Sequence, residues 1–275
     1  ILGGKPKSGK SWMALDFAVA VAGGRKALGA IECRPGPCLY LALEDNERRL
    51  QERLKAVLQG EDAPAGLTLA TEWKRADAGG LDDLHLWLSL NRDARLVIID
   101  TLAILRGKSN RYEGVYDNDY AAMNAYKTLA STSGVPLLLL HHLRKSTADD
   151  PLDSVSGTAG LTGAVDTVMV LKRETGDPNA LLYIRGRDVI ETETAVAFDT
   201  ATGKWSRIGP ADDFRLSQAR KAIVRAIIDN GDAMTPAEIV KAVGKSGPAV
   251  RMLLGKMLAA GELVQHHDGR YLVSD

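Results

Sequence analysis

Short apolar runs alternate with segments of helical spacing through the first part of the chain. The apolar runs cover residues 38–43, 96–99, 136–140 and 167–171. Runs of this length, without alternation to polar residues, are typical of strands that are buried on both faces of a parallel sheet. Residues 46–58 and 119–133 between them carry apolar side chains at helical spacing. The order strand, helix, strand predicts an α/β fold with a mostly parallel central sheet.

The pattern changes after Thr167, where strands follow one another without helices. We expect strands at 180–184, 194–198 and 204–208, the last pairing back across a turn at Thr202-Gly203. The first domain is therefore predicted to cover residues 1–208 and to end in a strand-rich edge. Residues 209–214 contain Gly209 and Pro210 and are predicted to form a linker.

Residues 215–275 have a different pattern, with three predicted helices followed by a hairpin. The first helix is expected at 216–230, the second after Thr235 as its N-cap, and the third at 246–260 with Ser246 as a candidate cap. Two short apolar segments, 263–265 and 270–273, flank a turn-forming sequence. Three helices and a hairpin predict a small winged helix-turn-helix domain.

Composition restricts the class of protein. The 275 residues include 35 Lys plus Arg and 35 Asp plus Glu, and 45% are hydrophobic, which excludes a disordered chain and a generally polyanion-binding one. No apolar run reaches the ~18 residues that span a bilayer, and no signal peptide is visible, so we expect a soluble, cytoplasmic protein without a membrane partner. The first residue is Ile1 rather than Met, which we interpret as a segment of a longer protein.

The strongest motif lies at the start of the chain and fits G-x-x-x-x-G-K-[ST] without a mismatch. It reads Gly4-Lys5-Pro6-Lys7-Ser8-Gly9-Lys10-Ser11. In such a P-loop the glycines let the backbone wrap a phosphate, the lysine reaches the β- and γ-phosphates, and the hydroxyl ligates Mg²⁺. The predicted helix that follows offers its positive end to the anion. We therefore predict ATP and Mg²⁺ as cofactors, with Lys10 on the phosphates and Ser11 on the metal.

Three further polar residues follow predicted strands. Asp100 ends the run at 96–99, where an acid holds Mg²⁺ in P-loop enzymes. Glu44 ends the run at 38–43 and is a candidate general base, with Asp45 as its competitor and as a candidate helix cap. His142 follows the run at 136–140 and is placed to contact the γ-phosphate.

These residues resemble the RecA-like ATPase core, and most closely the RepA-type hexameric helicases of plasmids and phages, which are relatives of the DnaB-type replicative helicases. The resemblance rests on the P-loop, residues 39–45 and 96–101, the pair His141-His142 and the segment Ser156-Gly157-Thr158 that follows it. It covers residues 1 to about 208. It implies that Glu44 is the catalytic base and that His142 senses the γ-phosphate. It also implies a central strand before the P-loop, of which only Ile1 and Leu2 remain.

The resemblance further implies a ring of six identical chains. DnaB-type relatives carry Lys-x-Arg on a late strand that enters the neighbouring subunit's ATP site, and Arg185-Gly186-Arg187 is similar, with Arg in place of Lys. We therefore expect Arg187 to act as an arginine finger, with Arg185 as its helper. The alternative is a solvated charge cluster at a strand end.

Nucleic-acid contacts are expected in two places. The resemblance places single-stranded DNA against loops 106–118 and 144–155, which carry basic residues and, in the first, tyrosines. The predicted winged helix leans basic, with Lys245, Arg251 and Lys256 at or on its third helix, and it could bind duplex DNA or a protein. Together these features favour an ATP-hydrolysing DNA motor. The alternatives are an ATP-dependent recombination or repair accessory and an ATP-switched DNA-binding regulator.

Overall fold

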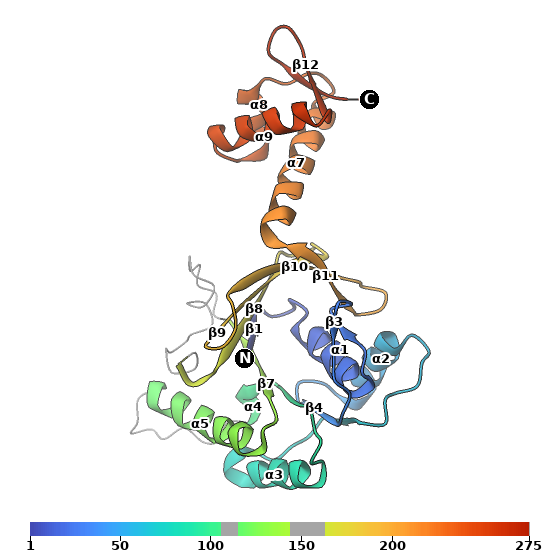
Figure 1. Ribbon diagram of the computed structural model, residues 1–275, viewed down its shortest axis with the longest axis vertical. Helices are drawn as coiled ribbons and strands as arrows, with labels where there is room; N and C mark the ends of the chain where they lie inside the picture. Colours follow the sequence, from blue (N-terminus) through green and yellow to red (C-terminus); the bar gives the residue numbers. More distant parts are fainter. Residues whose placement is uncertain (106–114, 144–162, 275) are drawn as a thin grey trace. The chain divides into compact units, whose positions relative to one another are not determined.

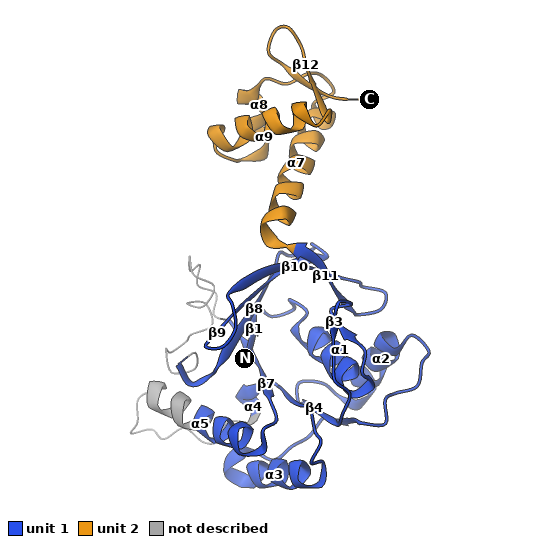
Figure 2. Cartoon of the chain, in the orientation of Figure 1, with its two compact units in different colours: residues 1–209 blue, residues 210–275 orange. Residues whose placement is uncertain are grey.

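The computed structural model describes residues 1–105, 115–143 and 163–274 (Figure 1). The chain forms two compact units, residues 1–209 and residues 210–275 (Figure 2). Each unit has its own hydrophobic core, so each is described by itself.

A single large sheet forms the centre of the first unit. In spatial order its described strands are β11 (Trp205–Pro210), β10 (Thr192–Phe198), β9 (Asn179–Gly186), β8 (Thr167–Arg173), β1 (Leu2–Gly4), β7 (Leu137–His142), β6 (Leu96–Asp100), β4 (Cys38–Ala42) and β5 (Leu67–Ala70). The strands from β8 to β5 in this order are parallel, and β9 runs antiparallel to both β8 and β10. The predicted mostly parallel sheet with a strand-rich C-terminal edge is confirmed.

Helices cover both faces of the sheet, and successive side chains of each strand point alternately to one face and the other. In β4, Tyr40 packs with α1 (Lys10–Gly23) and α2 (Glu47–Leu58), whereas Leu39 and Leu41 pack with α3 (Gly80–Leu90) and α5 (Val115–Ser133). Both sets are fully buried. This two-sided burial explains the unbroken apolar runs of the sequence.

The remaining elements of the first unit are short. They are the hairpin of β2 (Lys26–Ala27) and β3 (Ile31–Glu32), a 3₁₀ turn at Ala76–Ala78, and α4 (Leu102–Leu105).

Neither β5 nor α3 was predicted from the sequence. Strand β5 is only half-buried and gives no apolar run, and α3 begins directly after a glycine rather than a polar cap residue.

The second unit consists of α7 (Ala211–Asn230), α8 (Pro236–Val243), α9 (Gly247–Ala259) and the antiparallel hairpin of β12 (Leu263–Gln265) and β13 (Tyr271–Val273). These elements match the predicted three helices and hairpin. Thr235 and Glu238 form the expected capping box of α8. Ser246 occupies the N-cap position of α9, but its side chain makes no capping hydrogen bond.

One prediction at the junction is wrong. Helix α7 begins at Ala211, so residues 211–214 are helical rather than part of a linker. Pro210 stands at its N-cap, and Asp212 and Asp213 fall in its first turn, where acidic side chains favour the positive end of the helix. Gly209-Pro210 therefore marks the end of β11, and the two acidic residues after it lie in the first turn of α7.

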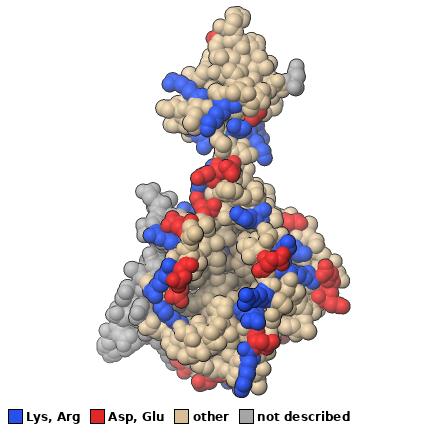
Figure 3. Space-filling view, viewed as in Figure 1, with Lys and Arg blue, Asp and Glu red and all other residues tan. Residues whose placement is uncertain are grey.

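Charged side chains of both signs are interspersed over the face of residues 1–209 that Figure 3 shows. None of the helices in the described part of the chain is long and apolar enough to cross a membrane.

A buried carboxylate ties α1 to β11, the last strand of the sheet. Asp16 is 7% exposed and accepts a hydrogen bond from the backbone N–H of Trp205 at 3.4 Å. Burial raises the pKa of Asp16 from 3.8 to about 6, although this hydrogen bond, Lys204 and Arg25 act in the opposite direction. The ionised carboxylate therefore destabilises the fold above pH 6.

This leads to a pH-dependent prediction for Asp16→Asn. Because the folded-state pKa lies above the unfolded one, the stability that comes with protonated Asp16 is complete below about pH 4 and is lost as the pH rises through about 6. The amide stays neutral, so the variant should gain up to about 3 kcal/mol over the parent at pH 8 and much less at pH 4.5. Urea unfolding at both pH values measures this difference. An equal difference at both would contradict the assignment.

Candidate active site

Polar groups gather at one edge of the sheet, where four neighbouring parallel strands end. The P-loop follows β1, Glu44 follows β4, and Asp100 and His142 are the last residues of β6 and β7. Register brings them level, because Gly4 pairs with His142 and Ala42 pairs with Asp100. The carboxyl edge of a parallel sheet is the usual ligand site of α/β proteins.

The P-loop adopts a shape that its two glycines make possible. Gly9 has φ 99°, and a Cβ there would lie 2.6 Å from Cζ2 of Trp205. A Cβ at Gly4 would lie 2.8 Å from the Ser8 hydroxyl. Lys5, Pro6 and Lys7 form the exposed crest of the loop, whereas Ser8 and Lys10 are buried.

The buried groups of this loop suit an anion. The Ser8 hydroxyl is a buried polar atom for which the described residues supply no hydrogen-bond partner. The Lys10 ammonium donates to the carbonyls of Gly4 at 2.8 Å and Lys5 at 3.0 Å. Burial lowers the pKa of Lys10, against the influence of nearby carboxylates. A buried cation, a hydroxyl and a helix N-terminus together fit a phosphate group.

A second cluster beside the loop suits Mg²⁺. The buried Asp100 carboxylate accepts hydrogen bonds from the hydroxyls of Ser11 and, at 3.0 Å, Tyr40. Burial raises the pKa of Asp100, and the two hydroxyls lower it. A carboxylate and a hydroxyl are oxygen ligands of the kind Mg²⁺ takes. Tyr40 was not predicted, although a tyrosine inside a fully buried strand usually has a polar partner.

Glu44 and His142 meet across the site. Nε2 of His142 lies 3.2 Å from Oε1 of Glu44, and both side chains are 42% exposed. Asp45 instead pairs with Arg49 and Arg53 and is almost fully buried. It does not cap α2, as the sequence suggested, because Asn46 is the N-cap and accepts from the Arg49 backbone N–H. Glu44 is therefore the carboxylate that is open to solvent.

An aromatic and cationic group flanks the other side of the P-loop and was not predicted. The Trp205 indole N–H donates to the Gly9 carbonyl at 3.3 Å. The Arg173 guanidinium lies 4.8 Å from the Phe198 ring and 5.5 Å from the Trp205 ring. A Cβ at Gly9 would be 3.5 Å from Nη1 of Arg173. Nothing in the sequence links these residues, which come from the ends of β8, β10 and β11.

Arg185 and Arg187 lie on the side of the sheet where the parallel strands begin, opposite the side where they end and the P-loop lies. Arg185 pairs with Val168 near the start of β8, whereas the P-loop continues from Gly4, which pairs with Leu171. Three residues of strand separate the two levels by about 10 Å, and the P-loop extends farther away. Neither arginine can therefore reach the P-loop of its own chain.

The predicted DNA loops fall largely outside the described residues. This applies to residues 106–114 of the first loop and to all of the second, 144–155. Residues 115–118 form the first turn of α5 rather than a loop, and this part of the prediction is wrong.

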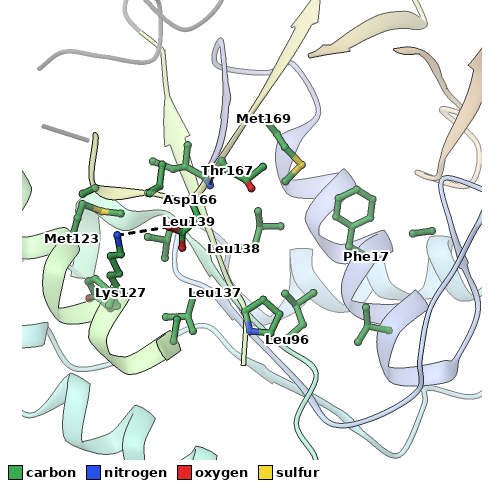
Figure 4. A pocket seen from close by; sticks show the side chains of 18 of the residues that line it. Phe17, Leu96, Met123, Lys127, Leu137, Leu138, Leu139, Asp166, Thr167 and Met169 are labelled. Atoms are coloured by element: carbon green, nitrogen blue, oxygen red, sulfur yellow. Dashed lines mark hydrogen bonds and ion pairs between the residues drawn. The ribbon is translucent and has the colours of Figure 1, made fainter. Parts of the chain in front are cut away.

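An apolar cavity of about 470 Å³ lies at the edge of the sheet away from the P-loop (Figure 4). Phe17 of α1 and Met123 of α5 line it from the two faces, and Leu137 and Thr167 line it from the strands. Lys127 and Asp166 form an ion pair at 3.7 Å beside it. None of the predicted site residues lines this cavity.

Comparison with known proteins agrees with this geometry. Residues 1–148 match the family described as AAA domain (AAA_25). A solved structure described as an ATPase domain has a TM-score of 0.60 at 14% identity, over 75% of this chain and 83% of that one. A DnaB-like replicative helicase, solved in a study of its interactions with primase, has a TM-score of 0.60 at 14% identity. That match covers 74% of this chain and 57% of the helicase, and both likenesses show a RecA-like fold.

Proposed function

The chain belongs to the AAA_25 family of AAA domains and is a P-loop ATPase, and from this premise we propose that it is the motor of a DNA helicase. The motor is a ring of six copies that translocates on single-stranded DNA, as a RepA-type replicative helicase of a plasmid or phage. The contact of Glu44 with His142, 3.2 Å apart beside the P-loop, carries the proposal. It joins a base to a polar group that can respond to the γ-phosphate.

Hydrolysis follows from the positions of these groups. Glu44 takes a proton from a water molecule, whose oxygen bonds to the γ-phosphorus while the bond to the β-phosphate oxygen breaks and its electrons stay on ADP. Lys10 and the loop N–H groups stabilise the charge on the phosphates. Mg²⁺, held by Ser11 and Asp100, neutralises further charge when bound. Because His142 contacts Glu44, loss of the γ-phosphate changes both side chains together.

The nucleotide base is proposed to lie against the cluster of Arg173, Phe198 and Trp205. Aromatic rings and a guanidinium plane offer stacking surfaces to a heterocycle. The cluster touches the P-loop at Gly9, so a nucleotide whose phosphates fill the loop has its base within reach of these side chains.

Arg187 is proposed to act on the ATP site of a neighbouring copy, with Arg185 as its helper. Its own P-loop lies beyond its reach, and a guanidinium placed at a γ-phosphate stabilises the charge that develops there. This makes the complete catalytic site a shared one. The DnaB-like replicative helicase supports the proposal, because it has the same fold.

Residues 210–275 are proposed to be a winged helix that binds duplex DNA, with a protein partner as the alternative outcome of the test. Basic side chains show on the face of this unit in Figure 3. Lys245, Arg251 and Lys256 are exposed, at the start of α9 and along it. In helix-turn-helix proteins the corresponding helix enters the major groove.

The first prediction separates nucleotide binding from hydrolysis. Lys10→Ala should abolish ATP binding, because it removes the buried cation of the loop. Glu44→Gln should bind ATP normally and lose at least about a hundredfold in turnover, because the amide cannot take a proton. Binding of a fluorescent ATP analogue and phosphate release measure the two steps. Asp45→Asn removes the neighbouring carboxylate in the same way and should bind ATP and turn it over like the parent. If Glu44→Gln instead hydrolyses ATP at the parent rate, Glu44 is not the base and Asp45 becomes the candidate.

The second prediction concerns the shared site. Arg187→Ala and Lys10→Ala chains should each be inactive alone, and their mixture should recover part of the DNA-stimulated turnover. At some interfaces an intact P-loop then meets an intact finger. If mixed rings form and stay as inactive as the separate variants, Arg187 does not act in trans. Strand displacement on a forked duplex then distinguishes a helicase from a recombination or repair accessory.

The third prediction concerns residues 210–275. If three phosphates are contacted, duplex affinity should fall with salt at a log–log slope of roughly −3. Arg251→Ala should weaken binding and flatten the slope by about one unit, as fluorescence anisotropy across a series of salt concentrations would show. No binding at the lowest salt would identify the unit as a docking module for a protein.

A further inference from the structure

The turn after β9 presents an isoleucine to solvent. Ile190 is 87% exposed, more than any other large apolar side chain in the described parts of the chain, and Val189 beside it is 42% exposed. Single exposed apolar residues are ordinary on protein surfaces. Exposure alone therefore does not identify a binding residue, and the contacts that fix the position of Ile190 must be considered as well.

These contacts hold the turn in one shape. Val189 folds back over the end of β9, where a Cβ at Gly186 would be 2.8 Å from its Cγ2. On the other side, Glu191 accepts a hydrogen bond from the Tyr183 hydroxyl at 2.8 Å and pairs with Arg185 at 3.5 Å. The isoleucine is thus displayed on a braced turn, so little conformational entropy is lost when it binds.

Arg187 belongs to the same turn and is braced as well. Its backbone N–H donates to the Asp166 carbonyl at 2.9 Å. Its guanidinium donates to the Gly163 carbonyl at 3.3 Å and lies 3.6 Å from the Asp166 carboxylate. Three residues span at most about 10 Å, so a surface that receives Arg187 has Ile190 within that distance along the backbone.

We propose that Ile190 is an apolar anchor that binds a second copy of this chain and seats Arg187 at that copy's nucleotide site. The proposal rests on the trans action of Arg187 proposed above, since the turn lies at the edge of the sheet away from its own P-loop. Arginine is enriched in interface hot spots, and hot spots lie in well-packed pockets from which water is excluded, an environment that an apolar neighbour such as Ile190 would supply. The charges of this turn balance, because Arg185 and Arg187 stand beside Asp188 and Glu191, so Ile190 rather than net charge is what the turn offers to a partner.

The test is the assembly of the full chain, followed by sedimentation velocity with Mg²⁺ and ATPγS over a range of protein concentrations. Ile190→Asp should need at least about tenfold more protein to assemble, because a charge replaces the buried side chain. Leu90→Asp is the matched control, since Leu90 is 75% exposed at the end of α3, and it should assemble like the parent. Binding of a fluorescent ATP analogue to the dilute chains and their thermal unfolding should be the same in all three.

Three results would overturn the anchor: assembly of Ile190→Asp at parent concentrations, equal loss of assembly in Leu90→Asp, or a parent chain that stays monomeric at every concentration. Arg187→Ala separates the anchor from the finger. It should assemble like the parent and lose turnover. If it keeps turnover while Ile190→Asp still fails to assemble, Ile190 contacts a second copy but does not seat a finger there, and that part of the proposal is overturned.

Discussion

The parallel register of β1, β4, β6 and β7 is the constraint on which the site depends. Neighbouring parallel strands end at the same side of the sheet, so residues that are far apart in sequence come together there. His142 and Glu44 are separated by 98 positions and lie 3.2 Å apart. The register is in turn enforced by two-sided burial, because a slip of one residue would exchange the side chains that face α1 and α2 with those that face α3 and α5.

The electrostatics of the site follow from the same packing. Lys10 and Asp100 are each 5% exposed. Burial lowers the pKa of Lys10 and raises the pKa of Asp100, so it favours the uncharged form of each side chain. Such groups are stabilised by partners of opposite charge, and a phosphate and a divalent cation supply them. The buried Ser8 hydroxyl, which has no hydrogen-bond partner among the residues that the structure describes, is a further group that a phosphate would satisfy. Binding and catalysis therefore use groups whose burial already costs folding free energy.

Much of this could be predicted from the sequence. The P-loop is a local motif, and the four apolar runs end where polar residues begin, so the strand-end positions of Glu44, Asp100 and His142 were accessible. Tyr40, Arg173 and Trp205 were not, because each contributes through contacts that the fold creates. The α7 start was misjudged because Gly209-Pro210 marks the end of β11, whereas the acids after it belong to the first turn of a helix. Strand β5 gave no signal since its side chains are only half-buried.

The central claim is that a complete catalytic site needs two copies of the chain, one with the P-loop, Glu44 and His142 and one with Arg187. The most direct measurement is ATP turnover per chain as a function of protein concentration, with saturating ATP, Mg²⁺ and single-stranded DNA. Turnover per chain should rise from near zero in the dilute monomer to a plateau, in parallel with the assembled fraction. Turnover that stays constant per chain down to concentrations at which the protein is monomeric would contradict the account.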